Sequence, residues 1–176
     1  MRPHALPIVL SSLAGLFACT QPEALVRPAS VCQIVRNSDA AWVGRVVSWE
    51  APRVMDLSGY KPPYEFAPVT VDVEQIRYGT GETGRVQILF PGKMEVDRHA
   101  SGRLQIDGTP TRGHLYVRTV DGRYVLASQG YFWEEDDGLH NAAKYLDTPI
   151  SEAELLERER AARAAESCPG DEYLDP

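Results

Sequence analysis

The sequence H-L-Y-V-R-T-V-D-G-R-Y-V-L-A-S, residues 114–128, decides the class of fold. β-branched and aromatic residues are frequent in both of its halves, 114–120 and 123–128, as is typical of strands. Asp121-Gly122 separates the halves, and an Asp-Gly pair supplies the positive φ angles that a two-residue hairpin turn requires. The stretch therefore predicts an antiparallel β-hairpin.

Upstream of this hairpin, further segments have the pattern of strands. Residues 69–76 alternate between valines on one face and polar side chains on the other, which predicts a half-buried strand. In the run 41–49, Gly44 marks a bulge or a corner. The other expected strands are 85–90, which follows a turn at 79–84 and ends at Pro91-Gly92, and the short segment 131–133.

One helix is expected on each side of these strands. Apolar residues in the segment 30–38 have helical spacing, and Ser30 is a plausible N-cap. Near the other end, Ser151 opens the capping box S-E-A-E, which predicts a helix through about Glu166 with Leu155 and Leu156 as its apolar contact. The many Arg and Glu residues of this second helix predict that it is mostly solvated.

The order of these segments predicts an all-β fold: a small antiparallel barrel of five or six strands with a short N-terminal and a C-terminal helix. The series A-A-W-V-G-R-V, V-T-V-D-V-E-Q-I-R-Y-G, V-Q-I-L-F-P-G, G-H-L-Y-V-R and D-G-R-Y-V-L resembles bacterial OB-fold domains related to the tissue-inhibitor/netrin module, over residues 30–134. In the tissue inhibitors a free N-terminal cysteine chelates the metal of the target protease. A β-sandwich is the alternative fold, because it produces the same spacing of strands and turns.

The N-terminus has the features of an export signal. Residues 1–18 combine Arg2 with an apolar run too short to span a bilayer, as in a signal peptide. The run ends L-F-A-C, which resembles the bacterial lipobox, and this resemblance implies lipidation of Cys19. The next residue is Thr20 rather than the aspartate that retains many enterobacterial lipoproteins at the inner membrane, so this resemblance implies the outer membrane. Ordinary cleavage near Ala18 with a free Cys19 is the alternative.

These features divide the chain into four parts. They are a signal peptide (1–18), a tether (19–29), an OB-like barrel domain (30–150) and a C-terminal helix with a tail (151–176). An acylated cysteine on a tether cannot chelate a metal as the tissue inhibitors do, so that mechanism is not expected here.

Export also bears on the other two cysteines, Cys32 and Cys168. Disulfides persist in oxidising compartments, so a bridge between these two is favoured over a pair of free thiols. They lack the close paired spacing of zinc ligands, and a metal site made of them is rejected.

Composition narrows the possible partners. The chain has 18 Lys and Arg against 25 Asp and Glu, a net charge of −7, and removal of residues 1–18 takes away only one charged residue, Arg2. A negative surface repels phosphate, so nucleic-acid binding is disfavoured. The expected partners are the membrane, through the lipid anchor, and an envelope protein.

The segment 59–66 is the expected partner-binding loop. It joins the first two predicted strands, and such connections often bind ligands in OB-folds. Tyr60, Tyr64 and Phe66 could form a contact surface on this proline-stiffened segment. The alternative is that the three rings close the end of the barrel.

No catalytic residue, metal site or cofactor is expected. The acidic run 134–138 is interpreted as a solvated turn, because it lacks the ligand spacing of a calcium loop. His99, His114 and His140 lie in different segments, and no nucleophile elbow, metalloprotease motif or phosphate-binding loop is present. We therefore expect a non-catalytic binding or structural protein of the envelope. An inhibitor of an exported hydrolase, or a hydrolase that uses one of these histidines, is the alternative.

Overall fold

The structure, a computed structural model, describes residues 29–91, 105–106, 109–110, 112–141 and 149–168. The signal segment, Cys19 and His99 lie outside these residues. The described chain is mostly β, with one helix near each end, as the sequence predicted. Its elements are α1 (Val31–Arg36), β1 (Ala40–Trp49), β2 (Arg53–Leu57), β3 (Tyr60–Tyr78), β4 (Gly84–Pro91), β5 (Gln105–Ile106), β6 (Thr109–Pro110), β7 (Arg112–Val120), β8 (Arg123–Glu135), β9 (Gly138–Asn141) and α4 (Glu152–Ala164).

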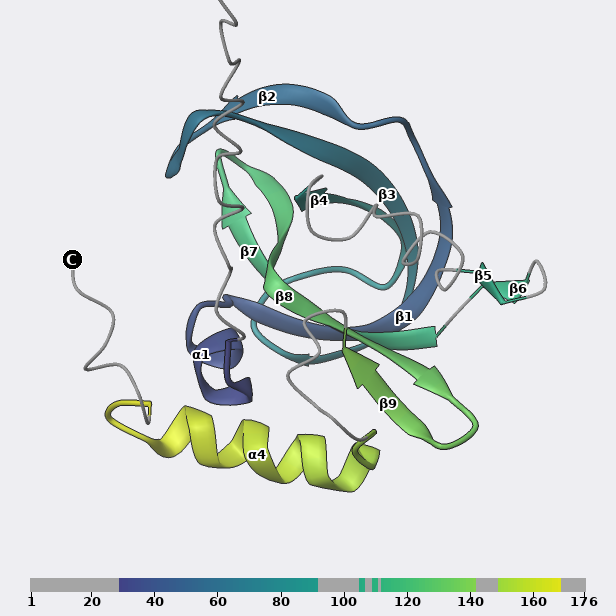
Figure 1. Ribbon diagram of the computed structural model, residues 1–176, viewed down its shortest axis with the longest axis vertical. Helices are drawn as coiled ribbons and strands as arrows, with labels where there is room; N and C mark the ends of the chain where they lie inside the picture. Colours follow the sequence, from purple (N-terminus) through teal and green to yellow (C-terminus); the bar gives the residue numbers. More distant parts are fainter. Residues whose placement is uncertain (1–28, 92–104, 107–108, 111, 142–148, 169–176) are drawn as a thin grey trace, which may run out of the picture.

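Five strands close into a ring, which Figure 1 shows from one end. The neighbours run β1-β7-β8-β4-β3, and β3 pairs back with β1. The sheet is mixed rather than purely antiparallel as predicted, because β4 and β8 pair in parallel at Ile88↔Tyr124 and Leu89↔Val125. These two strands are not consecutive in the chain, so no local turn fixes their relative direction. β2 extends the sheet beyond β3, and β9 pairs with β8.

The hairpin that decided the fold class is present. β7 and β8 pair from Val120↔Arg123 onward, and Asp121 and Gly122 both have positive φ, 50° and 72°. The predicted alternation in β3 is also confirmed, since Val69, Val71 and Val73 are buried. At Gly44 the pairing of β1 with β3 shifts register, and a Cβ there would lie 2.5 Å from the carbonyl oxygen of Asp72. The predicted bulge therefore requires glycine.

Two apolar clusters hold the ring and the helices. The first consists of inward-facing side chains from the strands of the ring and includes Trp42, Val71, Ile88, Phe90 and Leu115. The second packs the helices against the strands and is formed by Val31, Ile34, Val35, Ala41, Tyr116, Ala127, Phe132, Leu139, Ile150, Leu155 and Ala162. Burial of each large apolar side chain contributes on the order of 2 kcal/mol, so both clusters stabilise the fold.

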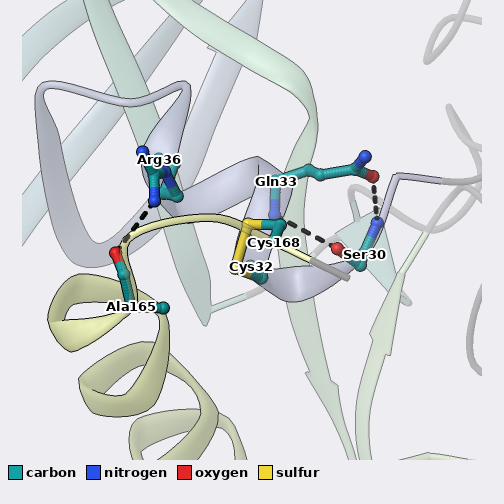
Figure 2. The surroundings of a disulfide bond; sticks show 6 residues. All are labelled: Ser30, Cys32, Gln33, Arg36, Ala165 and Cys168. Atoms are coloured by element: carbon teal, nitrogen blue, oxygen red, sulfur yellow. Dashed lines mark hydrogen bonds between the residues drawn. A yellow bond between two sulfur atoms is a disulfide. The ribbon is translucent and has the colours of Figure 1, made fainter. Parts of the chain in front are cut away.

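The two helices lie together on one side of the ring (Figure 1). The Ser30 side chain caps α1 and the Gln33 side chain returns a capping-box hydrogen bond, while Ser151 caps α4 through the amide of Glu154. Cys32 in α1 forms a disulfide with Cys168, just beyond α4, as predicted (Figure 2). Beside it, Arg36 donates a hydrogen bond of 2.8 Å from Nη1 to the carbonyl of Ala165. The two ends of the described domain are thus joined covalently.

In the predicted loop 59–66, Gly59 belongs to the turn after β2, and residues 60–66 are instead the first part of β3. This part pairs with β2, a strand that the sequence analysis did not predict, from Arg53↔Phe66 to Leu57↔Tyr60. Pro62 and Pro63 suggested a loop, because proline cannot donate to a sheet ladder. They are tolerated because β3 meets its other described neighbours, β4 and β1, only from Phe66 and Val69 onward, so this part of β3 pairs with β2 alone among the described strands.

The predicted acidic turn 134–138 is shorter than expected. Glu134 and Glu135 belong to β8, and only Asp136 and Asp137 form the turn into β9. In the described part of the chain no helix combines the length and the apolar composition needed to cross a membrane.

Candidate functional site

The predicted partner-binding residues lie together in the β2–β3 arm, which we define as residues 53–66. The ring centroids of Tyr60 and Phe66 are 5.0 Å apart, those of Tyr64 and Phe66 5.7 Å, and those of the two tyrosines 6.3 Å. Phe66 is fully buried beside Leu89 and Val125, whereas both tyrosines are partly exposed. Phe66 therefore anchors the arm, and only Tyr60 and Tyr64 can meet a partner without unfolding it.

The outer edge of this arm is open in the described structure. β2 pairs with β3 along one edge and with no other described strand. Its Val54 side chain is 64% exposed, the one large apolar side chain described as exposed. An edge strand presents unpaired backbone N–H and C=O groups, which an extended segment of another chain can use. The arm thus combines backbone pairing capacity with accessible apolar surface.

A second polar group of residues is buried between the ring and α4. Arg77 of β3 forms an ion pair with Glu159 of α4, and both side chains are less than 10% exposed. The Tyr116 hydroxyl accepts a hydrogen bond from Arg77 Nη2 and donates one to Glu159 Oε2, both at 2.9 Å. Such a pair is stabilised when its remaining donors and acceptors are also satisfied. Tyr116 does this in part, but Arg77 Nε is buried without a hydrogen-bond partner among the described residues.

His114 completes this buried group. Arg77 Nη1 donates to His114 Nδ1 at 2.8 Å, and because a guanidinium cannot accept, Nδ1 carries no proton. Burial, together with the charges of Arg77 and Arg112, lowers the pKa of His114 to about 3. The neutral ring therefore carries its proton on Nε2. That atom lies 3.5 Å from Glu152 Oε1 and 3.9 Å from Glu134 Oε1, without a hydrogen bond.

The third group lies at the end of the β8–β9 hairpin. His140 Nε2 is 2.7 Å from Asp137 Oδ1 and 3.6 Å from Glu135 Oε2. The hydrogen bond with His140 lowers the pKa of Asp137, so this carboxylate is ionised at neutral pH. Among the described residues, one group has side chains that could together hold a metal ion: Glu135, Asp137 and His140.

The sequence analysis did not find this third group. It compared the acidic run 134–138 only with a calcium loop, and Glu134 of that run does point elsewhere, to Arg112. What it lacked was β9, whose pairing places His140 opposite Trp133 and therefore near Glu135. The combination E-x-D-x-x-H across a two-residue turn was the available signal.

Of the other predicted site residues, Cys32 and Cys168 are joined as expected. Cys19 and His99 lie outside the described residues. His114 and His140 are both described but lie apart, one beneath α4 and the other on the β8–β9 hairpin.

Comparison of the chain with protein-family models, with curated proteins and with solved structures finds no match. A functional assignment therefore has to come from the residues and geometry of this chain.

Proposed function

We propose that the chain is a cell-envelope protein, anchored in the outer membrane by an acyl group on Cys19, that binds another envelope protein through the β2–β3 arm without catalysing a reaction. The observation that supports this location outside the cytosol is the Cys32–Cys168 disulfide. Structural disulfides are rare in the reducing cytosol and common in exported proteins. The apolar N-terminal run and the L-F-A-C sequence agree with the same destination.

The five-strand ring supports an OB-like barrel. An OB-fold is a five-stranded, partly open barrel whose neighbouring strands are not all consecutive, and the order β1-β7-β8-β4-β3 with the β3–β1 pairing has these properties. Such barrels commonly bind through the segments that project from their ends. The β2–β3 arm projects on the side of the ring away from α1 and α4 (Figure 1), so the helices leave it free.

The expected binding mode is the addition of an extended segment to β2. Backbone hydrogen bonds along the open edge would supply affinity. Val54 and Tyr64, which the register places on opposite faces of the arm, would supply side-chain contacts on the two sides of the added segment. A lipid anchor raises the effective concentration at the membrane surface, so a modest interface suffices. His114 is not proposed as a catalytic histidine, because it has no exposed surface with which to meet a substrate.

Intact mass tests the anchor. Native protein from the membrane fraction should begin at Cys19, carry added acyl mass, and gain about 2 Da on reduction of the one disulfide. An unprocessed, fully reduced chain in the soluble fraction would contradict the proposed compartment.

Crosslinking in intact envelopes tests the binding. Tyr60→Ala with Tyr64→Ala, and separately Val54→Lys, should both reduce recovery of the same crosslinked partner, because the first removes contact surface and the second places a charge on the strand edge. Tyr78→Ala is the matched control, since Tyr78 is also a partly buried tyrosine but contacts Ser38 near α1. Equal loss of the partner in all variants would show that the arm has no special part in binding.

A further inference from the structure

We propose that the end of the β8–β9 hairpin binds a divalent transition-metal ion, with zinc as the best fit, through Glu135, Asp137 and His140. This site lies outside the β2–β3 arm, and its existence does not depend on the binding role proposed above.

The three donor atoms already have spacings that suit one ion. Two ligands that each lie about 2.1 Å from a tetrahedral zinc ion are about 3.4 Å apart. The measured separations from His140 Nε2 are 2.7 Å to Asp137 Oδ1 and 3.6 Å to Glu135 Oε2, and all three donors lie within 4.8 Å of one another. An ion can enter once side-chain rotations separate Asp137 Oδ1 from His140 Nε2 by about 0.7 Å more and the Nε2 proton of their hydrogen bond is released to solvent.

The backbone fixes this arrangement without a long loop. Glu135 pairs with Gly138 and Trp133 with His140, so Glu135 and His140 lie on the same face of a two-stranded ribbon. Asp137 comes from the two-residue turn between them. Gly138 follows the turn with φ of 136°, and a Cβ there would lie 2.9 Å from the carbonyl oxygen of Ile150. The turn is therefore held against the residues that precede α4.

Trp133 orients two of the three ligands. Its indole Nε1 donates to Glu135 Oε1 at 2.7 Å, which leaves Oε2 as the oxygen nearer His140. The indole also stacks on the His140 ring, with centroids 6.0 Å apart and planes inclined by 19°. Trp133 itself is only 5% exposed, so it is a fixed support. Outer contacts of this kind hold metal ligands in position and strengthen binding.

The donor set selects the class of metal. One imidazole nitrogen with two carboxylate oxygens suits zinc and neighbouring transition metals, whereas calcium and magnesium take oxygen ligands. Asp137 is 66% exposed and Glu135 and His140 are 29% and 23% exposed, so water can reach the remaining coordination positions.

Calorimetric titration of the mature chain with zinc chloride tests the site. Removal of any one ligand should weaken zinc binding by at least on the order of tenfold, and the variants are Glu135→Gln, Asp137→Asn and His140→Gln. Trp133→Phe should weaken it by roughly tenfold, because Trp133 orients two of the ligands. Asp136→Asn is the matched control, because it removes the same charge from the adjacent turn position outside the group. It should leave the affinity unchanged.

A second readout locates the ion. With cobalt as a paramagnetic probe, the indole N–H signal of Trp133 should broaden, whereas that of Trp42, which donates to the carbonyl of Thr80, should stay sharp. The proposal is overturned if wild-type and His140→Gln chains bind zinc equally, if Asp136→Asn weakens binding as much as Asp137→Asn, or if millimolar calcium displaces the zinc.

Discussion

At the scale of single residues, His114 has surroundings that change its chemistry. Its imidazole lies on β7 beneath α4 and is fully buried, and it accepts a hydrogen bond from the Arg77 guanidinium. Both the burial and the neighbouring positive charges oppose protonation, and its pKa falls to about 3. A residue that the sequence offered as a possible catalytic histidine is thus held neutral inside the protein.

This lowered pKa makes the stability of the domain depend on pH. The unfolded chain protonates His114 near its ordinary pKa of about 6.5, while the folded chain stays neutral down to about pH 3. Between these values the unfolded state binds one more proton, so stability is lost as the pH falls. The loss due to this residue approaches about 1.4 kcal/mol per pH unit as an upper limit.

Urea unfolding at several pH values from 7 to 4 measures this effect. His114→Gln cannot take up the proton, so its free energy of unfolding should decline less steeply with falling pH than that of the wild type. Parallel curves for the two proteins would show that His114 does not titrate on unfolding in this range.

At the scale of elements, α4 shows that a helix rich in charged residues can contain a buried charged contact. Its many Arg and Glu residues predicted a mostly solvated helix with Leu155 and Leu156 as its apolar contact; Leu155 is buried and Leu156 is partly buried. Glu159, one turn further on, is buried as well because Arg77 of β3 lies opposite it. Helical spacing places Glu159 on the same face as Leu155, four residues earlier, and Glu157 on another face. A glutamate in this position does not by itself show that its charge is buried against a partner from a distant strand.

Glu159→Gln should destabilise the domain strongly. The change keeps the shape of the side chain but leaves the Arg77 guanidinium buried without a counter-charge, and such losses cost about 3–5 kcal/mol. Glu157→Gln, on the exposed face of the same helix, should change stability by no more than about 0.5 kcal/mol. Denaturant midpoints of the two variants check the difference, and similar midpoints would mean that the buried pair contributes little.

The strands show which features a sequence can reveal. The alternation of Val69, Val71 and Val73 and the Asp121-Gly122 turn are local signals, and both were predicted correctly. The pairing of β3 with β1 and the parallel pairing of β4 with β8 join distant segments, and no local pattern encodes them. The same limit applies to the candidate sites: the aromatic residues of the β2–β3 arm were visible in the sequence, but the strand edge beside them was not.

At the scale of the whole molecule, the Cys32–Cys168 disulfide joins positions separated by 136 residues. A crosslink over so long a loop removes much of the conformational freedom of the unfolded chain. The chain-entropy model puts the resulting stabilisation of the folded state at about 5 kcal/mol. In the folded state the same two segments are also held by the apolar cluster around Leu155 and by the hydrogen bond from Arg36 to Ala165. The fold therefore does not depend on the bridge for its geometry.

The double variant Cys32→Ala/Cys168→Ala should keep the native fold but lose about 2–5 kcal/mol of stability, because the constraint acts mainly on the unfolded chain. Circular dichroism should be unchanged at low temperature, while the urea midpoint should fall. Reduction of the wild type should give the same shift, and reduction of the variant should give none, which separates loss of the bridge from local effects of the alanines. If the variant instead unfolds in buffer, the contacts between α1 and α4 are too weak to hold the two ends together.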